Sequence, residues 1–261
     1  MNTNRKTTIS EGAKLANTNR QTAIKESKMK ITTPKLIRWA GLSAMVAGII
    51  FAGIQPIHPP DVLSSVNTSL WAILTYLKTA MSIFGLLGIA GIYARQVEKT
   101  GWLGLAGYLS LSIFYAVQMC FSFAEAFILP LLTTDAPKFV ESTLGMASGS
   151  GGEMNLGAFA TIFSVVSVLY LLGNLLFGIA MFRARILSRW AAGLLAFSGP
   201  LAVIMVALLP HQLERLAAMP MGIALAWLGY SLLSERREPA TEPVPSRAST
   251  SSAKPEPSKV A

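Results

Sequence analysis

Residues 70–93, LWAILTYLKTAMSIFGLLGIAGIY, form an apolar run that contains one charged side chain, Lys78. A helix that crosses a membrane needs ~20 mostly apolar residues, because the hydrocarbon is ~30 Å thick and a helix rises ~1.5 Å per residue. The run is apolar on most faces and does not alternate strictly between apolar and polar residues, as a strand of a membrane barrel would. It therefore predicts a transmembrane helix.

Five further stretches have the same length and character. They are residues 36–54, 102–129, 156–182, 190–209 and 213–233. The chain is 52% hydrophobic and only 13% charged, whereas soluble domains are ~25% charged. We therefore predict an all-α fold, a polytopic membrane bundle of about six transmembrane helices. The stretch 102–129 exceeds the length that a span requires, so we expect that helix to be tilted.

The two ends of the chain differ from its centre. Residues 1–35 are basic and polar, and residues 235–261 are rich in Pro and Ser. Neither segment has enough apolar side chains to form a core, so we expect both tails to be disordered around a transmembrane domain over 36–234. The polar start also predicts that there is no cleavable signal peptide. The single cysteine, Cys120, excludes an intrachain disulfide.

The distribution of positive charge predicts the orientation. Nineteen of the 22 Lys and Arg residues lie in the amino-terminal segment through Arg38, in the carboxyl-terminal tail or in the connections 94–101 and 183–189, whereas only Lys138 and Arg215 lie on the opposite side. Cytoplasmic loops carry the excess of Lys and Arg. We therefore expect a plasma-membrane protein with both termini in the cytoplasm. The net charge of +9 follows from this bias, so the expected partner is the lipid bilayer and not nucleic acid.

Two charged residues lie inside predicted spans, Lys78 and Glu125. Their helices should run in opposite directions, and at ~1.5 Å per residue the two depths differ by only ~5 Å. An ion pair inside the bundle is one interpretation, because intramembrane charges usually face the interior and are paired. The other is that Lys78 extends alone to the outer headgroups. Gln118 and Asn174 would complete a buried polar site.

Small and polar side chains recur at helical spacing on several spans. They could line a cavity, but Ser and Thr also form hydrogen bonds that hold helices together. The polar positions are Thr75, Lys78, Thr79 and Ser82; Ser112, Tyr115, Gln118, Ser122 and Glu125; and Thr161, Ser164, Ser167, Tyr170 and Asn174. The last span instead carries a ridge of small residues, which predicts a helix–helix contact and a possible oligomer through Ala218, Gly222, Ala226 and Gly229.

Both histidines fall in connections on the predicted outer side. His58 and His211 could bind a metal ion together with Asp61 and Glu214. No ligand spacing of a known zinc motif is present, and histidines at the ends of loops are commonly interfacial. No nucleophile motif is evident either. We therefore expect no cofactor, and we do not expect an enzyme.

The segment from the fourth to the fifth stretch carries a local resemblance. LGNLLFGIA at 172–180 and RWAAGLL at 189–195 resemble uncharacterised bacterial multi-pass membrane proteins of unknown-function families. The resemblance covers about a tenth of the chain. It implies a bacterial plasma membrane and no known activity, and it assigns no functional residue.

Three functions remain open on these observations. The first is a non-enzymatic accessory or structural membrane protein, which a dry bundle would favour. The second is a small-solute or ion transporter that uses Lys78 and Glu125, which a polar cavity around these residues would favour. The third is a membrane enzyme with a metal site at the outer histidines, which requires their ligand atoms to converge.

Overall fold

The computed structural model describes residues 32–148, 151–208 and 211–235. The regular elements of these residues are all helices, as predicted. The five long ones are α2 (Thr33–Ile54), α4 (Ser69–Phe123), α7 (Ala158–Ala184), α8 (Arg189–Leu208) and α9 (Met219–Ser234). The predictions for residues 1–31 and 236–261 lie outside this part of the chain.

Four helical segments are long and apolar enough to cross a membrane. They are Thr33–Ile57, Ser69–Leu132, Ala158–Ala184 and Leu213–Ser234, and α8 adds a shorter apolar helix, Arg189–Met205. The chain therefore has the character of a helical membrane protein. Two of the six predicted stretches, 70–93 and 102–129, fall within the single segment Ser69–Leu132, and the stretch 190–209 corresponds to α8.

The long helix α4 is a hairpin that turns at Gly101. This glycine has φ 55° and ψ −155°, which interrupts the helix and lies in a region almost restricted to glycine. The segments on either side, residues 69–100 (the first arm) and 102–123 (the second arm), contact each other along their length. Near the turn, the rings of Tyr93 and Tyr108 stack with centroids 4.6 Å apart. Far from the turn, the Trp71 indole donates to the Glu125 carbonyl oxygen at 3.1 Å. The arms are therefore antiparallel.

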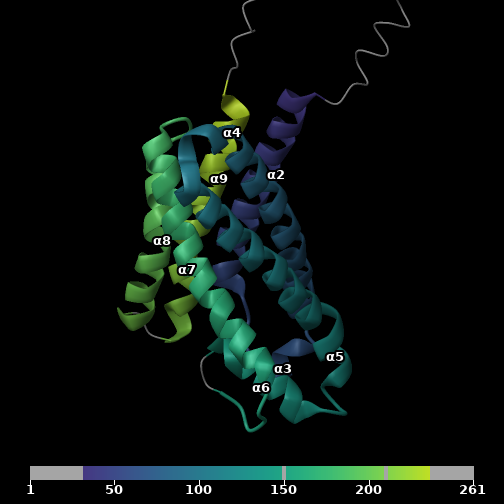
Figure 1. Ribbon diagram of the computed structural model, residues 1–261. Helices are drawn as coiled ribbons and strands as arrows, with labels where there is room; N and C mark the ends of the chain where they lie inside the picture. The colour runs from purple at the N-terminus through teal and green to yellow at the C-terminus, as the bar shows by residue number, and fades with distance from the viewer. Residues whose placement is uncertain (1–31, 149–150, 209–210, 236–261) are drawn as a thin grey trace, which may run out of the picture.

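The long helices pack into a ring. The first arm of α4 lies against α2, α4 also packs on α7, α7 packs on α8, α8 packs on α9, and α9 returns to α2 (Figure 1). Small residues allow the close approaches. A Cβ at Gly88 would lie 2.6 Å from the Ala44 Cα, and a Cβ at Gly107 would lie 2.3 Å from the Phe177 nitrogen.

The small-residue ridge of α9 packs inside the chain. A Cβ at Gly222 would lie 2.7 Å from the Ala52 nitrogen, and one at Gly229 would lie 2.4 Å from the Met45 nitrogen. Conversely, a Cβ at Gly48 would lie 2.3 Å from the Ala226 nitrogen. The predicted helix–helix contact of this ridge is therefore made with α2 of the same chain. Oligomerisation stays a prediction.

Helix α9 begins later than its apolar stretch. We predicted one helix over 213–233, but residues His211–Ala218 form a 3-10 helix, η3, and α9 starts at Met219. Pro220 lies in the first turn of α9. Proline has no N–H and suits the first turn of a helix, where no intrahelical acceptor is needed. The proline therefore fixes a new helix start at this point.

One end of the ring carries a small additional core. Helices α3 (Leu63–Val66), α5 (Leu129–Leu132) and α6 (Pro137–Ser148) lie there, at the lower end of Figure 1. The core consists of the apolar residues Val66, Trp71, Leu129, Val140 and Leu144. The connection after α2 and the connection before α9 lie at the same end of the bundle. We call this end the cap end.

The opposite end is closed by contacts of α4 and of the connection before α8 with the end of α9. The Arg95 Nε donates to Glu235 Oε2 at 2.8 Å, and the Ser188 nitrogen donates to the Ser231 hydroxyl at 3.1 Å. Three tryptophans near this end are strongly exposed: Trp39 at 68%, Trp102 at 85% and Trp190 at 79%. Tryptophan is enriched at membrane interfaces, so these residues are consistent with a membrane boundary here. We call it the tail end.

Candidate functional site

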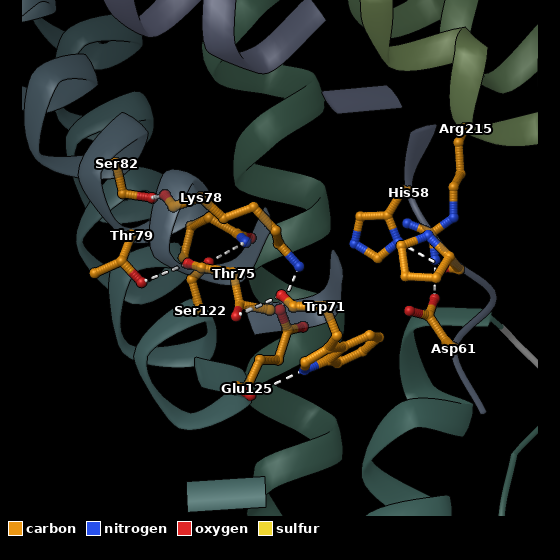
Figure 2. A network of polar contacts seen from close by, with 12 residues as sticks. His58, Asp61, Trp71, Thr75, Lys78, Thr79, Ser82, Ser122, Glu125 and Arg215 are labelled. Carbon is orange, nitrogen blue, oxygen red and sulfur yellow. Dashed lines mark hydrogen bonds and ion pairs between the residues drawn. The ribbon is translucent and has the colours of Figure 1, made fainter. Parts of the chain in front are cut away.

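Lys78 and Glu125 form an ion pair between the two arms of the α4 hairpin (Figure 2). Lys78 lies on the first arm, and Glu125 lies just beyond the second arm, in the π-helix η2 (Ala124–Ile128). The side chains are 13% and 18% exposed. Of the two interpretations of these charges, the structure therefore agrees with an ion pair. Lys78 does not extend alone to the headgroups.

The π-helical turn leaves the Glu125 carbonyl available to another helix. The Leu129 nitrogen donates to the Ala124 oxygen, which is the wide spacing of a π-helix, and Pro130 has no N–H to offer. The Trp71 indole, 1% exposed, donates to the Glu125 carbonyl at 3.1 Å. Single π-turns inside helices occur frequently at functional sites. Trp71 therefore fixes the backbone from which the carboxylate reaches Lys78.

A second ion pair lies beside the first at the cap end. Arg215 of η3 contacts Asp61, which follows α2 and the short 3-10 helix η1 (Gln55–Ile57) (Figure 2). The Asp61 side chain is 6% exposed. Burial raises the pKa of the Asp61 carboxyl, whereas the neighbouring Arg215 opposes the rise. This pair joins the connection after α2 to the segment that leads into α9.

His58 lies between the two ion pairs and remains neutral. Burial, followed by the positive charges of Lys78 and Arg215, lowers the pKa of His58 to about 3. Its Nδ1 lies 2.7 Å from the Pro59 oxygen. Because a carbonyl oxygen only accepts, Nδ1 holds the hydrogen and Nε2 is an acceptor. Nε2 is buried and has no hydrogen-bond partner among the described residues.

Lys78, Glu125, His58 and Arg215 line a cavity of about 360 Å³, whereas Asp61 is not part of its wall. The wall comes from α2, η1 and the connection after it, both arms of α4, η2, α7 and η3. Half of the wall residues are apolar: Phe51, Ile54, Met81, Phe114, Phe121, Phe163, Val166 and Leu171. The polar and charged part comprises Gln55, His58, Lys78, Gln118, Glu125, Ser167, Tyr170 and Arg215. The site is therefore an amphipathic pocket, with both signs of charge on its wall.

The other two residues predicted for the polar site behave differently. Gln118 lines the cavity and donates from Nε2 to the Ser122 hydroxyl at 3.1 Å. Asn174 is fully buried on α7 and donates to the Tyr170 carbonyl at 2.9 Å, but it does not line the cavity. Its Oδ1 has no partner in the described part of the chain. Asn174 is thus a core residue near the site and not part of its wall.

The predicted polar stripes are mostly satisfied within their own helices. The hydroxyls of Thr75, Thr79 and Ser82 each donate to the carbonyl four residues earlier. On α7, Thr161 and Ser164 are exposed, so the expectation that this stripe faces the interior is wrong at these positions. The hydroxyls mainly satisfy backbone carbonyls, and the cavity depends on other residues.

The possible metal ligands do not form a cluster. No group of three or more His, Cys, Asp or Glu side chains assembles within residues 32–148, 151–208 and 211–235. Asp61 pairs with Arg215, and His58 contacts its own backbone neighbour. The placement of the His211 side chain lies outside what the structure describes.

Sequence reasoning missed Arg215 as a wall residue of the site, whereas Tyr170 belongs to a polar stripe that was expected to line a cavity or to hold helices together. Arg215 was noted only as a charge on the outer side, and its partner Asp61 was considered as a metal ligand. A signal was present, because Asp61 and Arg215 have opposite charges and lie in connections on the same predicted side. Comparison with known proteins adds no further assignment: no protein family, curated protein or solved structure matches the chain.

Proposed function

We propose that this protein is a small-solute transporter of the plasma membrane, with six spans and both termini in the cytoplasm. The observation that carries the proposal is the cavity of about 360 Å³ whose wall includes the Lys78–Glu125 pair. Transporter sites commonly lie within the membrane, where irregular helices meet polar groups. Here the π-turn at Glu125 supplies the irregular backbone.

The six proposed spans are α2, the two arms of α4, α7, α8, and α9 together with the end of η3. Each arm of α4 exceeds the length of ~20 residues that a span needs. Helix α8, from Arg189 to Leu208, has about that length as well. The exposed tryptophans suggest a membrane boundary at the tail end, and the excess of Lys and Arg in the tails and in the connections at that end supports a cytoplasmic location for it. The cap end would then face outward.

The two ends of the bundle differ as a transport cycle requires. The cavity borders the cap end, whereas close contacts of small residues and the Arg95–Glu235 pair close the tail end. Alternating access exchanges such closures between the two sides of the site. We propose that the structure corresponds to the outward-facing half of this cycle and that the Arg95–Glu235 pair stabilises it.

Thiol labelling tests this proposal in intact cells. In a Cys120→Ser background, an impermeant thiol reagent added from outside should label Gln118→Cys, because Gln118 lines the cavity. Thr75→Cys is the control, since Thr75 is fully buried and is not part of the wall. Adding Glu235→Gln, at the opposite end, should slow the labelling of Gln118→Cys. A pair worth up to ~1 kcal/mol shifts the balance of the two conformations by up to about fivefold.

Two results would contradict the proposal. If Gln118→Cys were as unreactive as Thr75→Cys, the cavity would not be accessible, and an accessory role would be favoured. If Glu235→Gln left the labelling rate unchanged, the cavity would be static, and the protein would bind a solute without moving it.

A non-enzymatic accessory protein is the second candidate. It is favoured by the hydroxyls of Thr75, Thr79 and Ser82, which bond within their own helix and so serve packing. The close α2–α9 contact at Gly48 points in the same direction. Neither observation accounts for a cavity with charged groups of both signs on its wall.

A further inference from the structure

We propose that the cavity binds a zwitterion with one large apolar side chain, the chemistry of an apolar α-amino acid. This inference rests on the proposed role of the cavity as a solute site and names the class of solute. Three features support it: the charge balance of the site, the mixture of donors and acceptors on its wall, and its apolar remainder.

The charged groups of the site already balance. Lys78 is paired with Glu125, and Arg215 is paired with Asp61. A ligand with a net charge would leave that charge uncompensated in a low-dielectric setting, which is costly. A zwitterion adds no net charge, and its two ends can contact both members of an existing pair. The balance therefore favours a ligand that is neutral overall but carries both signs.

The wall offers partners for each end of a zwitterion. Lys78 and Arg215 can donate to a carboxylate, and Glu125 can accept from an ammonium. Two buried atoms on this wall, the His58 Nε2 and the Tyr170 hydroxyl, have no hydrogen-bond partner within the described chain. Buried polar atoms are normally hydrogen-bonded. An ammonium can donate to His58 Nε2, and a carboxylate can accept from the Tyr170 hydroxyl.

The rest of the cavity suits a ring or a branched aliphatic group. Phe114, Phe121 and Phe163 lie on its wall, and the rings of Phe121 and Phe163 meet edge to face with centroids 5.5 Å apart. Ligand pockets range over ~300–1,000 Å³, so a volume of about 360 Å³ is small. The apolar part therefore matches one side chain of aromatic size.

Calorimetry on the full-length protein in lipid nanodiscs tests this inference. The probe is L-phenylalanine, and the comparison ligands are N-acetyl-L-phenylalanine (a net anion), L-phenylalaninamide (a net cation) and glycine (no apolar side chain). We expect saturable binding of L-phenylalanine and at least about tenfold weaker binding of each comparison ligand, because each lacks one charge or the apolar group. Equal or tighter binding of either charged analogue would overturn the inference.

Two tryptophan variants locate the binding. Ser167 lines the cavity from α7, so Ser167→Trp should fill it and reduce L-phenylalanine binding by about tenfold or more. Ser164 is also exposed on α7 but is not part of the wall, so Ser164→Trp should bind as the unchanged protein does. Undiminished binding by Ser167→Trp would place the ligand elsewhere and overturn the inference.

The result is separable from the test of transport. If L-phenylalanine does not bind while Gln118→Cys is still labelled in the manner described above, the solute class is wrong and the transport proposal stands. If L-phenylalanine does not bind and Gln118→Cys is inert, both are wrong.

Discussion

Lys78 and Glu125 lie 47 positions apart in the sequence and form an ion pair across the α4 hairpin. The turn at Gly101 makes the two arms antiparallel, and the π-turn at the end of the second arm carries Glu125. The pair therefore depends on two departures from regular helix, one at each end of the second arm. Together, the two departures bring Lys78 and Glu125 to the wall of the same cavity.

The first prediction concerns the energy of this pair. Removing one partner of a buried pair leaves the other charge uncompensated, which typically costs ~3–5 kcal/mol, whereas replacing both is milder. The losses of unfolding free energy in the single variants Lys78→Met and Glu125→Gln should therefore add up to more than the loss in the double variant. We expect a coupling of ~1 kcal/mol or more, measured by unfolding in detergent micelles. Additive effects would mean that the two residues act separately.

The second prediction concerns the contact between α2 and α9. A Cβ at Gly48 would lie 2.3 Å from the backbone nitrogen of Ala226, so Gly48→Ala must separate the two helices. Forced overpacking typically costs ~1–3 kcal/mol. Gly53, near the end of the same helix, has nothing within 4 Å of its would-be Cβ. Gly53→Ala should therefore be neutral or slightly stabilising in the same thermal unfolding measurement, because alanine favours helix. Equal losses for the two variants would contradict this packing.

The third prediction concerns the hairpin turn. Gly101 has open space around its would-be Cβ, so the only obstacle to a side chain is its positive φ of 55°. Gly101→Ala should cost ~1–3 kcal/mol through backbone strain. Gly193 is helical and would make only ordinary contacts at 3.6 Å, so Gly193→Ala is the matched control. A Gly101→Ala protein as stable as the control would show that the turn tolerates another backbone conformation.

Much of the fold follows from hydropathy, because long apolar runs can satisfy their backbone in lipid only as helices. The predicted helix over 36–54 corresponds to α2, and that over 190–209 corresponds to α8 within a residue or so. The antiparallel course of 70–93 and 102–129 was expected, but the position and form of the turn between them were not. The turn rests on the φ of Gly101, and glycines also lie inside the helices of this chain.

The site was predictable only in part, for a geometric reason. The depths of Lys78 and Glu125 follow from counting residues along two helices, so their proximity could be expected. The Arg215–Asp61 pair depends on how two connections lie over the bundle, which residue spacing does not determine. The position of Asn174 behind the wall depends on the rotation of α7 about its axis. The exposure of Thr161 on the same helix shows how uncertain that rotation is from sequence.

The fourth prediction concerns orientation. Glu153 lies in the connection before α7, at the cap end, and Lys99 lies next to the α4 turn, at the tail end; both are exposed. In a Cys120→Ser background, an impermeant thiol reagent should label Glu153→Cys in intact cells. Lys99→Cys should become reactive only after the cells are permeabilised, because the tail end carries the excess positive charge. The reverse labelling pattern would invert the proposed topology.

The last prediction concerns the pH dependence of stability, to which His58 should contribute. In the unfolded chain, His58 binds a proton below about pH 6.5, whereas burial beside Lys78 and Arg215 keeps it neutral in the fold down to about pH 3. The unfolded state therefore binds the additional proton within this window, and the stability of the fold falls as the pH falls. One proton corresponds to at most ~1.4 kcal/mol per pH unit.

The variant His58→Gln isolates this contribution, because it removes the titration and keeps a polar side chain. The raised pKa of Asp61 acts in the opposite direction, since its folded form gains a proton before the unfolded form does. Lys78, Glu125 and Arg215 face the same group and are unchanged in the variant. As the pH falls from about 6.5 to 5, the stability of His58→Gln should therefore increase relative to that of the unchanged protein. Parallel stability curves over this range, from thermal unfolding in detergent micelles, would mean that His58 titrates normally in the folded protein.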